Sequence, residues 1–202
     1  MTRISKPPQE RRKEILDTAL ELFLKNGYEN TSVGDIVTKL GVAQGLFYYY
    51  FKSKEEVYRA ALEQYTDDFA LQLTSMILED RPFGVKIETI FKTMEDLVAS
   101  SEHALMDGVH LSEHIDMDNR LSLHVAQLLI EPVTGMLEEL NEKGKTQLEN
   151  CELTSIFLVY GIFGLLHENT GHADNRLIFK AADVVALTAR VLGIPRENLM
   201  QI

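Results

Sequence analysis

Apolar side chains recur every three or four residues along almost the whole chain, a period typical of amphipathic helices. Alternation of apolar and polar residues, which marks a half-buried strand, is not found. The pattern predicts helices at 8–26, 33–40, 43–50 and 54–79. Five more are expected at 83–99, 102–114, 118–142, 152–169 and 174–192. We therefore expect an all-α protein with about nine helices.

Residues 31–56 have the pattern of a helix-turn-helix. The helix expected at 33–40 has one apolar face and stops at Gly41, and a short helix ending in an aromatic cluster follows it. Ser32 with Asp35, and Ser53 with Glu56, fit the capping pattern in which an acid follows a hydroxyl residue by three positions. The second helix of such a pair can lie in the DNA major groove, where all four base pairs differ.

Helical spacing divides the second helix into two faces. Phe47, Tyr50 and Phe51 stand three and four residues apart and should point inward. The outward face then carries Gln44, Gly45, Leu46, Tyr48 and Tyr49. We expect this outward face to contact DNA.

Each outward residue suits a different contact. Gln44 can pair with an adenine edge, Gly45 permits close approach of the backbone, and Leu46 can pack on a thymine methyl group. Tyr48 and Tyr49 can each offer a hydroxyl to a phosphate, which fixes register without reading sequence.

Helix starts attract phosphate, so Thr31, Ser32 and Lys54 are candidates for contacts with the DNA backbone. Alternatively, Ser32 and Ser53 only cap their helices, which contributes roughly 1 kcal/mol each. The two roles are compatible.

The chain resembles the TetR family of bacterial transcriptional repressors. The residues that carry this resemblance are Thr31, Ser32, Val33, Asp35, Ile36, Val37, Gly41, Val42, Gly45, Leu46, Phe47, Tyr48, Tyr50, Phe51, Lys52, Ser53, Lys54, Glu55 and Glu56. The chain departs from the family pattern at Ala43, where a small hydroxyl residue is usual, and at Gln44, where a lysine is frequent. The resemblance implies a repressor released from its operator when a ligand tilts the helix after Ser53.

Charge is divided unevenly along the chain. The net charge is −11 from 20 Lys or Arg and 31 Asp or Glu; residues 1–56 hold nine basic and eight acidic residues, so they carry +1 and the rest carries −12. Arg3, Lys6, Arg11, Arg12 and Lys13 form a basic arm opposed within the first thirteen residues only by Glu10. Such an arm either contacts the DNA minor groove or backbone, or is a disordered, solubilising tail.

Composition points to a bacterial cytoplasmic protein. The single cysteine, Cys151, excludes an intramolecular disulfide framework, and a small, partly buried side chain is its simplest interpretation. The first residues lack the apolar segment of a signal peptide, and no apolar run reaches the roughly 18 residues that a membrane span requires.

The part of the chain after Ser53 is expected to bind an effector and a second copy. Side chains on several helices, most of them apolar and adaptable, are candidates to line a pocket for a mainly hydrophobic molecule with a few polar anchors: Phe91, Met94, Met106, His110, Leu128, Phe157 and Tyr160. Small residues on the last two helices are candidates for a dimer interface: Gly161, Gly164, Ala182, Val185, Ala186 and Ala189. Ordinary packing within one core is the alternative for both sets.

One short string matches a catalytic motif. Residues 110–114 match the inverted zinc-protease motif His-x-x-Glu-His, and His103 falls on almost the same helical face. A third distant ligand and an open groove are not evident, so we expect neither an enzyme nor a cofactor or metal.

The predicted organisation is a DNA-binding domain at 1–53 and an effector-binding and dimerisation domain at 54–202. The expected partners are a palindromic double-stranded DNA operator, a small molecule and a second copy of the chain, with no membrane. The alternative function is a helical small-molecule or metal-binding protein without operator binding.

Overall fold

The computed structural model describes residues 6–99, 111–170, 179–195 and 198, and within these ranges the regular structure is all-helical. Eight helices are described: α1 (Pro8–Asn26), α2 (Val33–Leu40), α3 (Gln44–Tyr50), α4 (Lys54–Leu78), α5 (Phe83–Ala99), α7 (Leu111–Glu142), α8 (Cys151–Thr170) and α9 (Ala181–Val191). The predicted all-α class is confirmed. Among these helices, none combines the length and apolar character needed to cross a membrane.

Two predicted boundaries were wrong. The helix expected from 118 begins at Leu111, so the break expected after residue 114 does not occur; most of the helix expected at 102–114 lies outside the described residues. The last helix begins at Ala181 and not at 174, because the Asp183 carboxylate accepts the Lys180 amide hydrogen at 2.9 Å and caps the helix there.

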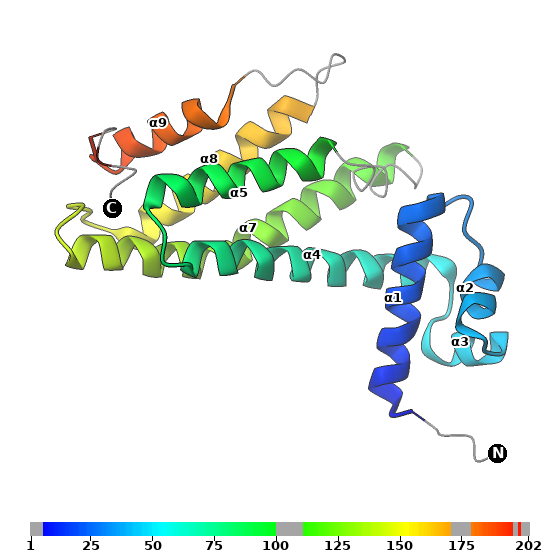
Figure 1. Cartoon of the computed structure of the whole chain (residues 1–202). Coiled ribbons are helices and arrows are strands. Elements are labelled where there is room, and N and C mark those ends of the chain that lie inside the picture. The colour runs from blue at the N-terminus through cyan, green and yellow to red at the C-terminus, as the bar shows by residue number, and fades with distance from the viewer. Residues whose placement is uncertain (1–5, 100–110, 171–178, 196–197, 199–202) are drawn as a thin grey trace. The chain divides into compact units, whose positions relative to one another are not determined.

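The chain divides into two compact units, which meet in the sequence between Thr66 and Asp67, within α4. In the first unit, α1, α2, α3 and the start of α4 share an apolar core (Figure 1). Its fully buried anchors include Ile15 and Phe23 from α1, Ile36 from α2 and Phe47 from α3. Burying side chains of this size contributes roughly 1.5–3 kcal/mol each, which holds the three short helices together.

Local signals fix the ends of α2. Ser32 and Asp35 form the predicted capping box: the Ser32 hydroxyl accepts the Asp35 amide hydrogen at 3.1 Å, and the Asp35 carboxylate accepts the Ser32 amide hydrogen at 2.8 Å. At the other end, Gly41 adopts φ 64°, a left-handed conformation that favours glycine. The turn between α2 and α3 is therefore set by the sequence around it.

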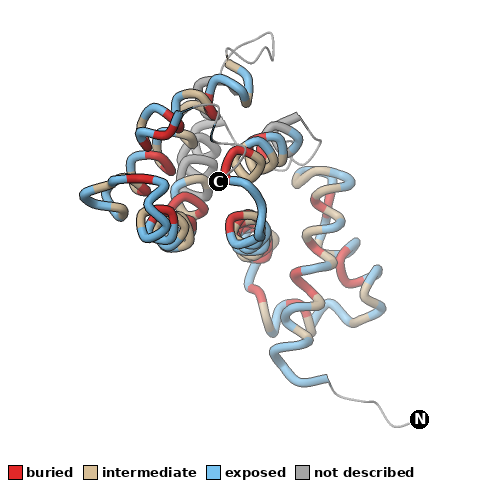
Figure 2. The backbone as a smooth tube through the Cα atoms, turned by 60° about the vertical axis from the view of Figure 1, so that its left-hand side comes forward, coloured by how far each residue is buried: buried red, intermediate tan, exposed pale blue. Residues whose placement is uncertain are grey.

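The second unit contains the end of α4 with α5, α8, α9 and most of α7. Two apolar clusters form its core, and Figure 2 marks the buried residues of its described part in red. A polar network closes the connection between α7 and α8, where the Asn141 side chain binds the Leu148 amide and carbonyl and the Thr146 hydroxyl.

Candidate nucleic-acid interface

The helix α3 is held from behind by two buried rings. Phe47 is 0% exposed and Phe51, the residue that ends the helix, is 1% exposed, and their ring centroids lie 5.9 Å apart. Ala43, at the start of the helix, offers no side-chain cap. The position of α3 therefore depends on its aromatic anchors more than on its own two turns.

The opposite flank of α3 is exposed, as the sequence predicted. Gln44 and Gly45 are exposed, Leu46 is half-buried, and Tyr48 and Tyr49 are 51% and 76% exposed. A Cβ built on Gly45 would meet no atom within 4 Å, so another molecule can approach the backbone there. Contact of these five residues with DNA stays a prediction.

Ring contacts hold the tyrosines of α3 in place. Tyr48 packs edge-on against Phe47 at 5.4 Å between centroids, and Tyr49 packs edge-on against Tyr50 at 4.9 Å. Tyr50 is half-buried and not part of the innermost core, so the expectation that it belongs to the core was too strong. The two exposed tyrosines are thus oriented before any partner binds.

The expected backbone contact by Thr31 was wrong, because its polar groups are used inside the unit. Thr31 is 1% exposed; its hydroxyl lies 2.8 Å from the Gly27 carbonyl oxygen and 3.2 Å from that of Leu22, and its amide donates to the Tyr28 carbonyl. Thr31 fastens the turn after α1 and leaves no donor for phosphate.

Ser32 and Lys54 also have partners within the unit. The Ser32 hydroxyl donates to Asp35 at 2.6 Å, and together with the Ser32 amide it lowers the pKa of that carboxyl. The Lys54 ammonium lies 4.1 Å from the centroid of the Tyr28 ring and 3.5 Å from the Glu29 carbonyl oxygen. Both residues are accessible to a neighbour, and their phosphate contacts remain predictions.

The basic arm is partly neutralised inside the unit. Lys6 and Arg11 both pair with Glu14, and the pKa of Glu14 is lowered, first by the hydrogen bond from Lys6. Arg3 lies outside the described residues. Among residues 6–66, the cations that make no ion pair are Arg12, Lys13, Lys25, Lys52 and Lys54. These are the charges available to phosphate.

An apolar cavity of about 80 Å³ lies in the second unit, between α4, α5, α7, α8 and α9. Its lining comprises Ile77, Phe83, Ile87, Ile90, Phe91, Met94, Leu129, Val133, Met136, Leu158, Val159, Ile162, Phe163, Val184 and Thr188. The one polar side chain among them, Thr188, donates its hydroxyl to the Val184 carbonyl at 2.9 Å. The described lining therefore offers no free donor to a ligand.

The predicted pocket residues separate into three groups. Phe91 and Met94 line the cavity. Leu128 is 42% exposed and Phe157 is 64% exposed, so both were wrongly placed, and Tyr160 packs against the core without lining the cavity. Met106 and His110 lie outside the described residues. Most lining residues were missed because buried apolar positions on five helices give no signal of which of them surround a void.

The small-residue face is only partly exposed. Gly161 and Gly164 on α8 are exposed, and a Cβ on either would meet no atom within 4 Å. On α9, Ala182 is exposed and Ala186 half-buried. Val185 and Ala189 were wrongly assigned to this face, because they are 5% and 2% exposed and belong to the core cluster.

Large apolar side chains extend the exposed face of α8 and α9. Leu153 and Phe157 are 63% and 64% exposed and stand about two turns and one turn before Gly161, and Leu187 on α9 is 51% exposed. The sequence analysis did not assign these three residues to the interface; the spacing of Leu153 and Phe157 with Gly161 is the signal that could have identified those two. An exposed apolar patch of this kind marks an interaction surface.

The histidine string is not tested by the structure. His103 and His110 lie outside the described residues, and the side chain of His114 is not described. Elsewhere, no group of three or more His, Cys, Asp or Glu in the described part of the chain is arranged to hold a metal ion.

The comparisons agree with this geometry. Residues 15–61 match the family model described as bacterial regulatory proteins, tetR family. The chain is 25% identical over 173 residues to the HTH-type transcriptional regulator SrpR of Pseudomonas putida, covering 83% of this chain and 79% of SrpR. It is 42% identical over 59 residues to the HTH-type transcriptional regulator YuxN of Bacillus subtilis. This alignment covers 29% of the chain and only 20% of YuxN.

A solved structure has the same fold over nearly the whole length. The crystal structure of a TetR-family transcriptional regulator from Mesorhizobium loti matches with a TM-score of 0.64 at 16% identity, covering 93% of this chain and 96% of that one. The family-model match and the relatives thus support a DNA-binding transcriptional regulator of the helix-turn-helix class. Residues 15–61 of the chain thus have the sequence of the bacterial regulatory proteins of the tetR family.

Proposed function

We propose that the chain is a ligand-responsive repressor that binds a palindromic DNA operator as a homodimer and is released by a small apolar molecule. Residues 1–53 form the DNA-binding domain in this proposal, and residues 54–202 bind the effector and the second copy. The observation that carries it is the exposed flank of α3, where Tyr48 and Tyr49 are 51% and 76% exposed above two buried rings.

The exposed face of α8 and α9 supports the dimer. Phe157 and Leu153 offer apolar area, while Gly161 and Gly164 allow a partner helix to approach closely. A two-fold axis would place two copies of α3 about one DNA turn apart, roughly 34–36 Å, or a multiple of it, which requires a near-palindromic site.

The cavity supports an apolar effector, and its described lining gives no support for polar anchors. Burying a polar group without a hydrogen bond costs roughly 1–3 kcal/mol, and the described lining offers no free donor. At about 80 Å³ the cavity is smaller than drug-sized ligand pockets of roughly 300–1,000 Å³, so the effector must enlarge it. Ile77, near the end of α4, lines the cavity, so enlargement would act on the helix that continues from the DNA-binding domain.

Selection of bound sites from random double-stranded DNA tests the proposal. We expect a near-palindromic consensus, and Gln44→Ala should relax the preference at one base pair in each half-site by about 1–3 kcal/mol. Sedimentation at micromolar concentration should show a dimer. Recovery of no consensus would favour a helical ligand-binding protein without operator binding.

Two further variants test the tyrosine contacts. Tyr48→Phe and Tyr49→Phe should each weaken binding on every DNA sequence by a similar factor, about tenfold for each hydrogen bond to a charged group that is lost and so about a hundredfold for the dimer. Tyr160→Phe makes the same chemical change on α8, outside the DNA-binding domain, and should leave the affinity unchanged.

A further inference from the structure

Arg12, on α1, has a surrounding unlike that of the other basic residues near the N-terminus. Its guanidinium carbon lies 5.0 Å from the centroid of the Phe51 ring, and Phe51 is the 1% exposed residue that ends α3. The Arg12 side chain is itself exposed. A positively charged side chain from α1 therefore lies over the ring of Phe51, the buried residue that ends α3.

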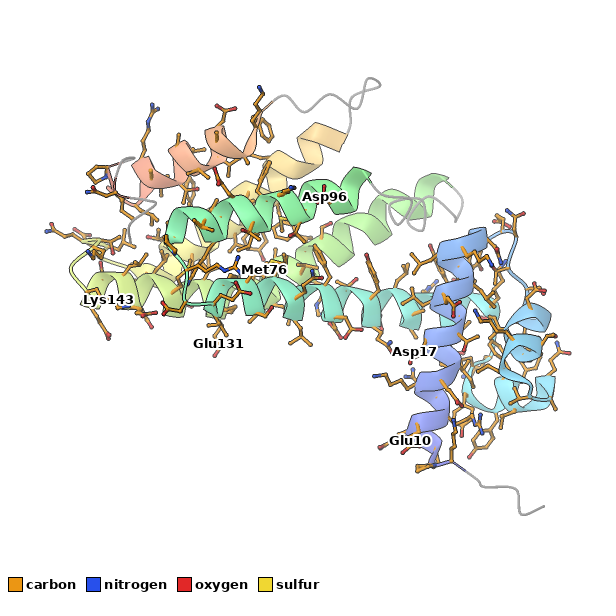
Figure 3. The ribbon with its side chains drawn as sticks, in the orientation of Figure 1. Glu10, Asp17, Met76, Asp96, Glu131 and Lys143 are labelled. Carbon is orange, nitrogen blue, oxygen red and sulfur yellow. The ribbon has the colours of Figure 1, made fainter. Side chains whose placement is uncertain are left out.

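The charge of Arg12 is not neutralised in the unit. The preceding residue, Arg11, and Lys6 are both paired with Glu14, whereas Arg12 makes no ion pair among the described residues. Figure 3 shows Glu10 on the side of α1 turned away from α3, and two residues further along a helix the side chain points about 200° away from it. Of the two acids nearest in sequence, Glu10 therefore faces away from Arg12, and Glu14 is paired with Lys6 and Arg11.

Two acids follow Phe51 closely in sequence. Glu55 pairs with Arg59, and the Glu56 carboxylate accepts the amide hydrogen of Lys52 at 2.6 Å. Lys52, directly after Phe51, is exposed and makes no ion pair in the described part of the chain. The end of α3 therefore carries two cations without an ion pair within the described ranges, Arg12 and Lys52, beside one carboxylate, Glu56, that is bound to a backbone amide.

Ring contacts connect Arg12 to the proposed DNA-contacting flank. Phe51, beneath Arg12, lies 5.9 Å from Phe47, which lies 5.4 Å from the half-exposed Tyr48. Stacking on a buried ring limits the conformations of the arginine and leaves the edge of its planar guanidinium free to donate to an oxyanion. The Arg12 guanidinium is therefore held in a defined position beside α3.

We propose that Arg12 binds a backbone phosphate of the duplex next to the end of α3. Phe51 positions its guanidinium, which donates hydrogen bonds to the phosphate oxygens without reading base sequence. This inference rests on the proposed DNA binding and adds a contact from α1 to those of α3.

The test measures affinity for a selected operator between 50 and 200 mM KCl for Arg12→Ala and for Arg11→Ala as the matched control. Removing one phosphate contact per protomer should reduce the slope of log affinity against log salt by about 0.9, or about 1.8 for a dimer. Over this fourfold salt range, the affinity ratio of wild type to Arg12→Ala should then shrink about twelvefold. Arg11→Ala, whose charge is paired with Glu14, should keep the wild-type slope.

Two more variants separate charge from packing. Arg12→Met keeps apolar contact with Phe51 and should show the same reduced slope of log affinity against log salt. The slope can therefore be measured even if the alanine variant does not fold. Arg12→Lys keeps the charge and should retain the slope while binding more weakly, because it lacks the planar fork.

A wild-type slope for Arg12→Met, or an equal loss for Arg11→Ala, would overturn the phosphate contact. Failure of the wild-type protein to bind any duplex would instead refute the proposed function. The two failures are therefore distinguishable.

Discussion

Replacing Thr31 by valine tests whether this residue fastens the turn after α1 or binds DNA. The side chain is 1% exposed, and its hydroxyl faces the carbonyl oxygens of Gly27 and Leu22 at 2.8 and 3.2 Å. A hydroxyl has one hydrogen, so the two acceptors share it. Valine has nearly the same shape but leaves both carbonyls without this donor.

The expected cost of Thr31→Val is about 1–3 kcal/mol, the range for leaving a buried polar group unsatisfied. For a chain of this length, each kcal/mol lowers the melting temperature by roughly 2–4 °C. Thr31→Ser is the matched control, because it retains the hydroxyl and loses one methyl group, worth about 0.8 kcal/mol when buried.

Tyrosine fluorescence during thermal unfolding is a suitable assay. The chain has no tryptophan, and six of its seven tyrosines lie at or before Tyr65, so the signal reports mainly the DNA-binding unit. Well below the transition, Thr31→Val should bind operator DNA as wild type does. Unchanged stability together with weaker binding on all sequences would refute the structural role and restore the phosphate contact.

Three further predictions follow from other parts of the structure. Gly161→Leu should convert the dimer to monomer in sedimentation, whereas Gly135→Leu on α7, an equally open glycine, should not; dissociation by both would argue against the α8 interface. Hydrogen bonds from Ser32 lower the pKa of Asp35, so this cap stabilises the fold above about pH 4, and the stabilisation is lost as the pH falls through the lowered pKa. Asp35→Asn should therefore remove that part of the dependence of the unfolding free energy on acid pH. An unchanged pH profile of stability in this variant would contradict the prediction. Val159→Phe should fill the cavity and abolish xenon binding seen by NMR, at a cost of about 1–3 kcal/mol; retained binding would place the void elsewhere.

Helix boundaries were predictable where short-range signals set them. The observed helices begin or end at three such signals: the capping box of Ser32 with Asp35, the left-handed Gly41, and Pro82 directly before the start of α5 at Phe83. Each of these signals involves only residues a few positions apart. The start of α9 was missed because the capping acid, Asp183, follows a residue, Lys180, that is not a usual cap.

Which side of a helix is buried was less predictable in the second unit. The helix α8 is apolar around most of its circumference, so spacing alone did not show that Phe157 faces outward while Leu158 and Val159 are buried. On α9, Val185 and Ala189 are small enough for an interface, yet neighbouring helices of the same chain cover them.

The sequence by itself determined the helix-turn-helix, because the period of α2, its cap and the two phenylalanines of α3 are local features that leave only one flank of α3 outward. Only the tertiary structure decided where the Thr31 hydroxyl points, which ring seats Arg12 and which side chains enclose the cavity. Each of these depends on contacts between residues distant in sequence, and a one-dimensional period carries no information about such pairs.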